Sequence, residues 1–231
     1  DVCSSDLDGT DGTGATVAYQ VMVDGFGGKD IVSNVTRVIG SGLNDTLKGT
    51  AGDDVLEAGA GDDFIISTGG ADTVDGGANT TNAGGGDWLS FQLITTANLA
   101  DPDGYTGVRA NMSGGALSSG LGSTNISGIE NIKGTSGNDT ITGDSGNNTI
   151  FGYAGNDILD GKAGNDYIDG GDGLDTADFS TSTGSELINL VYQGVGEASG
   201  ADGEDTLLNI ENIIGSIYAD TIYGSSISNS L

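Results

Sequence analysis

A nine-residue repeat dominates the chain, and this period limits what the chain can fold into. Aspartates recur nine residues apart in one series from Asp45 to Asp72, in a second from Asp139 to Asp175 that has Asn148 at one position, and in a third that begins at Asp220. The surrounding residues keep the same phase. Most units have Gly at positions 1 and 4, Asp at position 6 and an aliphatic residue at position 8. Leu43, Ala58, Ser67 and Asn148 depart from this pattern.

The composition of one unit predicts its shape. Nine residues are too few for a helix-turn-helix unit, and each Gly disfavours a helix by about 1 kcal/mol. Six residues rich in Gly, Asn and Asp predict a tight turn, because these residues tolerate positive φ angles. The remaining polar-aliphatic-polar triplet predicts a short strand with one inward side chain. Two units then form an 18-residue coil. The expected fold class is all-β: a parallel β-roll of two to three arrays, joined by short antiparallel β segments.

The same geometry creates a need for a cation. Each unit buries only one aliphatic side chain, so the core is thin. The coils also bring aspartates 18 residues apart, such as Asp139 and Asp157, onto one edge, where their charges repel. A Ca²⁺ ion between successive turns would remove the repulsion, since Ca²⁺ takes about six to eight oxygen ligands. Its binding free energy would then be part of the folding free energy.

Composition narrows the choice of ligand and function. The chain of 231 residues has 34 Asp and Glu against 6 Lys and Arg, a formal net charge of −28, one Cys and no His. The absence of His excludes His-dependent nucleophilic catalysis and His-bearing zinc sites. The deficit of basic residues argues against nucleic acid as a partner. Abundant oxygen donors without soft ligands favour Ca²⁺ over zinc or copper.

The candidate site residues follow from the phase of the repeat, and none is catalytic. The candidate metal ligands are the position-6 side chains Asp45, Asp54, Asp63, Asp72, Asp139, Asn148, Asp157, Asp166, Asp175 and Asp220. The turn glycines expected to supply carbonyl oxygens are Gly49, Gly52, Gly61, Gly134, Gly137, Gly143, Gly146, Gly152, Gly155, Gly161, Gly164, Gly170, Gly171 and Gly173. We expect about four to seven Ca²⁺ ions. Trp88 and Phe91 are interpreted as core residues at the end of a roll.

Units such as 152–160 (GYAGNDILD) and 161–169 (GKAGNDYID) resemble the Gly-Gly-x-Gly-x-Asp-x-aliphatic-x nonapeptide of the RTX, or haemolysin-type calcium-binding, proteins. Residues 129–141 (IENIKGTSGNDTI) are similar to the segment that leads into an RTX array, and this segment recurs from Ile210. The resemblance implies a secreted bacterial protein that is exported by a type I secretion machinery. It also implies an extracellular place, at the cell surface in some members, and folding on contact with extracellular Ca²⁺.

The domain organisation is expected to alternate between arrays and joins. We interpret residues 1–7 as a non-native tail derived from a sequencing adapter, and residues 8–39 as a partial flanking β segment. The first array is expected at 40–91, the second at 134–180, and the truncated start of a third at 215–231. Period-two stretches predict joining β segments at 92–133 and 181–214.

Three functional interpretations remain open. The first is a non-catalytic calcium-binding β-roll region of a secreted protein. The second is the accessory module of a secreted protease, lipase or polysaccharide epimerase whose catalytic domain lies elsewhere. The third is the repeat region of a surface adhesin. Ca²⁺ ions and the secretion machinery are the expected partners, without nucleic acid or membrane insertion. The sequence predicts no oligomeric state.

Overall fold

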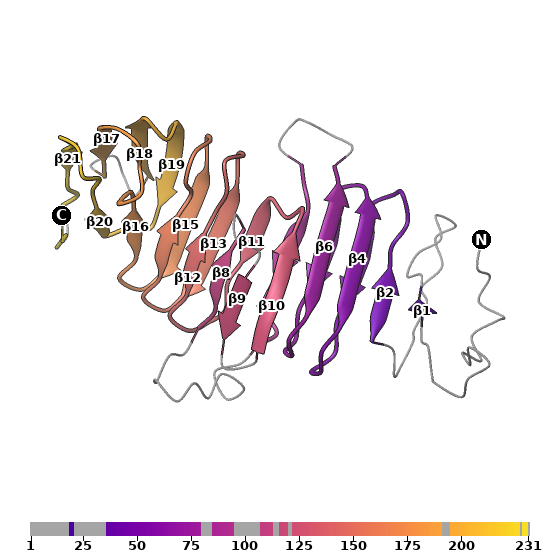
Figure 1. The fold of residues 1–231 in the computed structure, drawn as a ribbon. Coiled ribbons are helices and arrows are strands. Elements are labelled where there is room, and N and C mark those ends of the chain that lie inside the picture. Colours follow the sequence, from indigo (N-terminus) through magenta and orange to yellow (C-terminus); the bar gives the residue numbers. More distant parts are fainter. Residues whose placement is uncertain are drawn as a thin grey trace.

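The computed structural model describes residues 19–20, 36–79, 85–94, 107–112, 116–119, 122–190, 195–226 and 228–230. Every regular element among them is a β-strand, and the strands follow one another in a single row of coils (Figure 1). The segment interpreted as an adapter-derived tail, residues 1–7, lies outside the described residues. The all-β parallel roll expected from the repeat is confirmed.

Two sheets form the roll. The 11-stranded sheet has, in spatial order, β1 (Tyr19–Gln20), β2 (Arg37–Ile39), β4 (Val55–Ala60), β6 (Thr73–Ala78), β10 (Gly122–Ser127), β9 (Ala116–Ser119), β8 (Arg109–Asn111), β12 (Thr140–Thr142), β14 (Ile158–Asp160), β16 (Thr176–Asp178) and β20 (Asn212–Ile214). The 10-stranded sheet has β21 (Thr221–Tyr223), β17 (Glu186–Asn189), β18 (Val195–Gly200), β19 (Glu204–Leu208), β15 (Tyr167–Asp172), β13 (Thr149–Ala154), β11 (Asn131–Lys133), β7 (Trp88–Ser90), β5 (Phe64–Ile66) and β3 (Thr46–Lys48).

The register of the sheets is the register of the repeat. Strands 18 residues apart pair in parallel, so that Ile150 lies beside Ile168 and Ile141 beside Leu159. The position-8 side chains fill the space between the sheets. Eight of them are at most 1% exposed: Leu47, Leu56, Ile65, Val74, Ile141, Ile150, Leu159 and Ile168. The single inward side chain of each short strand is therefore the core.

The joining segments contain antiparallel hairpins but do not interrupt the roll. β8, β9 and β10 pair antiparallel, as do β17, β18 and β19. The strands that flank these hairpins return to parallel pairing: β11 lies between β7 and β13, and β20 pairs with β16. Stacked coils therefore continue through the expected joins.

A second set of side chains ties the coils together at position 5. Asn138 Oδ1 accepts a hydrogen bond of 2.8 Å from the backbone N–H of Asn156, and Asn156 Oδ1 accepts one of 3.0 Å from the N–H of Leu174. Each bond joins residues 18 apart. In these exposed turns the side-chain oxygen of Asn accepts the hydrogen bond that a backbone carbonyl oxygen accepts between two strands. These residues therefore extend the stacking beyond the sheets.

Two aromatic residues differ in their placement. Phe91 is 1% exposed and belongs to the core, as expected. The prediction for Trp88 is wrong, because its side chain lies half-buried on the outer face of the 10-stranded sheet and stacks on Phe151. In the repeat, Trp88 occupies position 7, which points away from the core, and Leu89 takes the inward place.

Candidate metal centre

The position-6 side chains form two rows, one at the start of the strands of each sheet. The first carboxylate row contains Asp45, Asp63, Asp87, Glu130, Asn148, Asp166 and Asp205, beside the 10-stranded sheet. The second carboxylate row contains Asp54, Asp72, Asp139, Asp157, Asp175 and Glu211, beside the 11-stranded sheet. Nearly all the predicted metal ligands therefore fall into these rows. Asp220 lies apart from both, beside Glu186 at the end of the 10-stranded sheet.

Each row is held by one repeated hydrogen bond. The backbone N–H of Asp139 donates to Oδ1 of Asp157 at 2.7 Å, and that of Asp157 donates to Oδ1 of Asp175 at 2.8 Å. In the first row, Asp45 makes the same bond to Asp63 at 2.7 Å. The bond satisfies a backbone donor in the turn and fixes one carboxylate oxygen. The second oxygen of each carboxylate is left for another partner.

Several of these second oxygens are buried without a hydrogen-bond partner. They are Oδ1 of Asp45 and Oδ2 of Asp63, Asp87, Asp157, Asp166 and Asp175. The six residues are at most 3% exposed. A buried carboxylate oxygen without a partner is unfavourable, because it has lost its hydration and gained nothing in return. Each of these atoms can therefore accept a further partner, such as a cation.

Burial also raises the pKa of several row carboxylates. Loss of solvent, reinforced by the charges of neighbouring carboxylates, raises the pKa of Asp87, Asp157 and Asp166 to about 7. Burial likewise raises the pKa of Asp175 and Asp205 to about 6. The same desolvation raises the pKa of Asp72 and Asp139 to about 6. A cation beside these oxygens would favour their charged form again.

The position-1 glycines leave space beside Oδ2 of the position-6 carboxylates. This oxygen lacks a partner in Asp157 and accepts from the N–H of Thr135 in Asp139. A Cβ atom at Gly152 would collide with Oδ2 of Asp157 and would lie 2.6 Å from the carbonyl oxygen of Gly170. A Cβ atom at Gly134 would collide with Oδ2 of Asp139 and lie 2.9 Å from the carbonyl oxygen of Gly152. Each space is thus bordered by a carboxylate of one coil and a carbonyl of the next. This all-oxygen donor set suits Ca²⁺.

The predicted turn glycines separate into two groups. Those at position 1 border the position-6 side chains, which are carboxylates except for Asn148 beside Gly143: Gly49, Gly134, Gly143, Gly152, Gly161 and Gly170. The carbonyls of Gly152, Gly161 and Gly170 lie against the space of the preceding coil. Most of the others pack on the backbone of the preceding coil, among them Gly61, Gly155, Gly164, Gly171 and Gly173. All five have positive φ angles, so they serve the shape of the turn.

Five predicted ligands are absent from the set with an unpartnered oxygen. Thr50 donates to Oδ2 of Asp54, Ser67 to Oδ2 of Asp72, and Thr135 to both oxygens of Asp139.

Asn148 and Asp220 have other partners as well. Asn148 Oδ1 accepts from the N–H of Asp144 at 3.0 Å, while Asn148 Nδ2 donates to the Glu130 carbonyl at 3.0 Å. Asp220 accepts from the N–H groups of Glu186 and Ser216 and from the Ser216 hydroxyl. Its slight burial raises the pKa, but these hydrogen bonds outweigh it and hold the pKa of Asp220 below its usual value.

Four row members were missed from the sequence: Asp87, Glu130, Asp205 and Glu211. Glu130 Oε2 accepts from the N–H of Asp87 at 2.8 Å, and Glu211 Oε2 accepts from the N–H of Asp175 at 2.9 Å. Asp205 Oδ1 accepts from the N–H of Asp166 at 2.9 Å. All four lie two residues before a buried aliphatic side chain: Leu89, Ile132, Leu207 and Ile213. That offset is the signal that would have found them.

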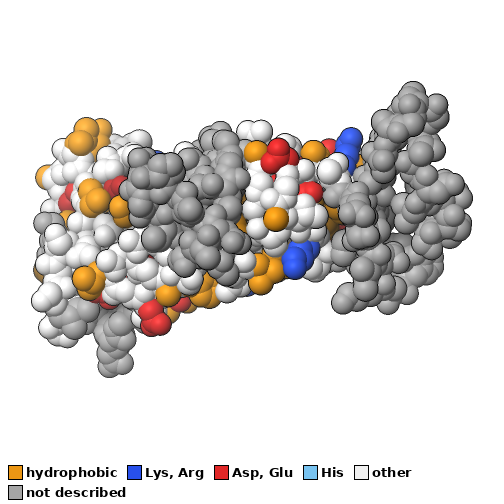
Figure 2. All heavy atoms as spheres, turned by 90° about the horizontal axis from the view of Figure 1, so that it is seen from below, with side chains coloured by type: hydrophobic (Ala, Val, Ile, Leu, Met, Phe, Trp, Pro, Cys, Tyr) orange, Lys and Arg blue, Asp and Glu red, His pale blue; other side chains and the backbone are white. Residues whose placement is uncertain are grey.

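Carboxylates alone do not complete a metal site. Over the described ranges, no three Asp, Glu or Cys side chains are grouped as a metal centre. The turn carbonyls must therefore supply much of any coordination shell. The formal charge is also not gathered at one place on the face shown in Figure 2, where acidic side chains are scattered. Many of the acidic side chains lie instead in the two carboxylate rows.

Comparison with known proteins agrees with this geometry. Residues 39–74, 126–159 and 151–179 match the family model of the RTX calcium-binding nonapeptide repeat (4 copies). The curated proteins compared with the chain include no match. None of the described residues forms a helix long and apolar enough to cross a membrane. The matched ranges contain most of both carboxylate rows, and these stretches of the chain are RTX calcium-binding repeats folded into a β-roll.

Proposed function

We propose that this region is a calcium-dependent folding module of a secreted protein, without a catalytic role of its own. The observation that carries the proposal is the set of six buried carboxylate oxygens that lack a hydrogen-bond partner. Ca²⁺ is the partner that fits both their spacing and their neighbouring carbonyls.

The proposed ligands are the row carboxylates together with the position-1 carbonyls of the next coil. Asp157 would bind with its Oδ2 atom while Oδ1 remains held by the N–H of Asp139. Gly170 would add its carbonyl oxygen from the following coil. Asp87 and Glu130 extend the same arrangement across the first join. About four to seven ions fit the two rows.

The folding switch follows from the charge. Without Ca²⁺, the rows bring like charges together in a desolvated place, and the thin core does not offset this. Because ions bind the folded coils and not the extended chain, a site occupied at 100 times its Kd adds about 2.7 kcal/mol to the stability of the fold. Several sites together therefore hold the roll folded at extracellular Ca²⁺ concentrations. In the bacterial cytosol the chain would stay unfolded and ready for export.

Circular dichroism of the full chain tests this proposal. The far-ultraviolet spectrum is expected to be that of an unfolded chain in EGTA and that of a β-sheet protein in about 10 mM Ca²⁺, which exceeds the typical Kd of extracellular sites by about tenfold or more. Mg²⁺ at the same concentration is the control, because it demands a stricter octahedral shell. A chain equally folded in EGTA and in Ca²⁺ would contradict the proposed switch.

A further inference from the structure

Aromatic side chains gather on the outer face of the 10-stranded sheet. The ring of Trp88 stacks on Phe151 with centroids 5.8 Å apart, and Phe151 lies 5.9 Å from both Tyr153 and Tyr167. All four side chains are half-buried. By contrast, the strands β2, β4, β6, β12, β14, β16 and β20 of the other sheet contain no aromatic residue. This aromatic row therefore belongs to one face of the roll.

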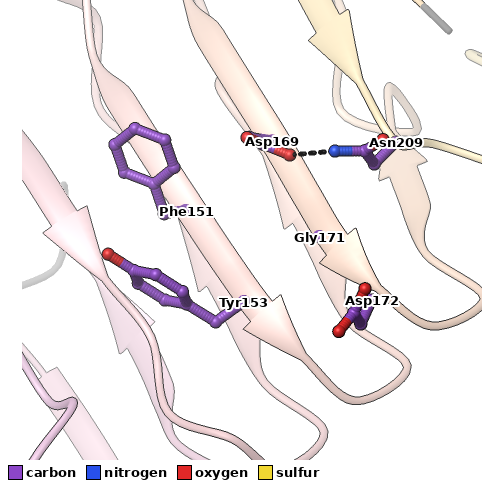
Figure 3. A pocket seen from close by; sticks show the side chains of 6 residues that line it. All are labelled: Phe151, Tyr153, Asp169, Gly171, Asp172 and Asn209. Carbon is purple, nitrogen blue, oxygen red and sulfur yellow. Dashed lines mark hydrogen bonds between the residues drawn. The ribbon is translucent and has the colours of Figure 1, made fainter.

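A hollow of about 330 Å³ opens beside this aromatic row, over Gly171. Phe151 and Tyr153 form one wall, and Asp169, Asp172 and Asn209 form the other (Figure 3). Gly171 has a φ of 98° and no side chain, whereas the preceding coil has Tyr153 at the equivalent position. The missing side chain is what opens the space.

The polar wall consists mainly of acceptors. Asn209 Nδ2 donates to Oδ1 of Asp169 at 2.7 Å, so the amide donor turns toward the carboxylate. Asp169 Oδ2, both oxygens of Asp172 and the Asn209 carbonyl remain to accept hydrogen bonds from a ligand. A neutral sugar also needs donors, which among the side chains of this lining come only from the Tyr153 hydroxyl and the second hydrogen of Asn209 Nδ2, and an anion would be repelled. A ligand with donors only, and with positive charge, matches this wall.

The aromatic row already binds such a group from within the chain. The ammonium of Lys133 lies 4.7 Å from the ring centroid of Trp88 and 5.1 Å from that of Phe64. Cations over aromatic faces are attracted by the ring quadrupole. The hollow repeats this pairing with Phe151 and Tyr153 and adds two carboxylates, but provides no cation of its own.

We propose that this hollow binds an alkylammonium or guanidinium group, carried by a Lys or Arg side chain of a basic partner. The aliphatic stem of such a side chain would lie on Phe151 and Tyr153, with its charged end between Asp169 and Asp172. The formal charge of −28 would favour the approach of such a partner. The proposal is separate from the carboxylate rows, since none of the lining residues belongs to them.

NMR titration of the Ca²⁺-saturated chain tests the site, with n-butylammonium and n-butylguanidinium as probes. Both are expected to shift the amide signals of Tyr153 and Gly171 in a saturable way. n-Butanol, which keeps the stem and loses the charge, should bind about tenfold more weakly. Methyl glucoside should cause no saturable shift. The proposal is overturned if the glucoside binds more tightly than the cations, or if neither cation shifts these signals.

Matched variants separate the site from the overall charge. Asp172→Asn and Tyr153→Gly should each weaken n-butylammonium binding about two- to fivefold. Glycine suits the φ of 79° at Tyr153, so this variant should fold. Asp178→Asn removes the same charge from the outer face of the other sheet and should leave n-butylammonium binding unchanged. If Asp178→Asn weakened n-butylammonium binding as much as Asp172→Asn, the proposal would be overturned. If the chain folded with Ca²⁺ but bound neither cation, the cation site would be contradicted and the proposed calcium-dependent folding would not.

Discussion

Glu130 accepts a 2.8 Å hydrogen bond from the backbone N–H of Asp87, although 43 residues separate them in the chain. The bond takes the place of the Asp–Asp bond that joins coils 18 residues apart elsewhere. β11 at the same time lies between β7 and β13. The strand pairing therefore passes from one array into the next, and Glu130 extends the first carboxylate row across the join. At the next step the contact changes, because Asn148 Nδ2 donates to the Glu130 carbonyl.

The first prediction concerns this junction. Glu130→Ala should leave the N–H of Asp87 without its acceptor and lower the unfolding free energy in Ca²⁺ by about 1–3 kcal/mol. It should also reduce the cooperativity of unfolding, because the arrays are coupled there. Urea unfolding followed by circular dichroism measures both. Glu204→Ala, at an exposed position, is the control and should unfold like the unmodified chain; identical curves for both variants would argue against coupling through Glu130.

The second prediction concerns a central ligand. Asp157→Asn keeps the Oδ1 acceptor for the N–H of Asp139 but removes one charge from the row. The variant should need a higher Ca²⁺ concentration to fold, because one ligand is weaker. In the presence of a chelator, the row carboxylates of this variant should repel one another slightly less than those of the unmodified chain. A Ca²⁺ titration followed by circular dichroism measures both the folding midpoint and the signal without Ca²⁺. An unchanged midpoint would contradict the assignment of Asp157 as a ligand.

The third prediction concerns pH in Ca²⁺-free buffer. The raised pKa values of about 7 for Asp87, Asp157 and Asp166 mean that the folded coils bind protons more tightly than the unfolded chain. Their protonation stabilises the fold fully below the unfolded pKa near 4, and this stabilisation is lost as the pH rises to about 7. The β-sheet signal without Ca²⁺ should therefore grow on acidification from pH 8 to pH 4.

With Ca²⁺ present the pH dependence should have the opposite sign. Protons compete with Ca²⁺ for the same carboxylates, so the Ca²⁺ midpoint should rise as the pH falls below about 7. Calorimetric titration at pH 8 and at pH 6 measures this change. Equal affinities at both values would indicate that the buried carboxylates are not the ligands.

The fourth prediction concerns the space beside the carboxylates. Gly152→Ala places a Cβ atom against Oδ2 of Asp157 and near the Gly170 carbonyl, where the ion is proposed to bind. We expect a destabilisation of about 1–3 kcal/mol in Ca²⁺ and a higher Ca²⁺ midpoint. Gly42→Ala is the matched control, because its Cβ meets no atom within 4 Å. Folding of both variants at the same Ca²⁺ concentration would contradict an ion at this position.

The regular parts of the fold follow from the sequence because one local rule repeats. Ile150 and Ile168 are buried, and Asp157 and Asp166 lie in the rows, since turn chemistry and the nine-residue phase agree at each of these positions. No long-range information is needed to place them. The assignment of these aspartates as ligands remains a prediction.

The joining segments were harder to predict from the sequence, because pairing between strands that are distant in the chain determines their structure. Glu130 and Glu211 have no glycine-rich turn of the repeat before them, and only their pairing with distant strands brings them into the rows. Trp88 shows the other difficulty. An isolated aromatic residue beside Leu89 and Phe91 looks like core, and only the direction of the strand shows that it points outward.

The hydrogen bonds between coils give the roll a polarity. At position 6 each coil donates its N–H to the carboxylate of the next coil, as Asp139 does to Asp157. At position 5 the direction is reversed, as between Asn156 and Asn138. The two ends of a stack therefore present complementary sets of donors and acceptors. Two copies meeting end to end could continue the pattern only head to tail, as in a filament, whereas a symmetric pairing would set carboxylate against carboxylate.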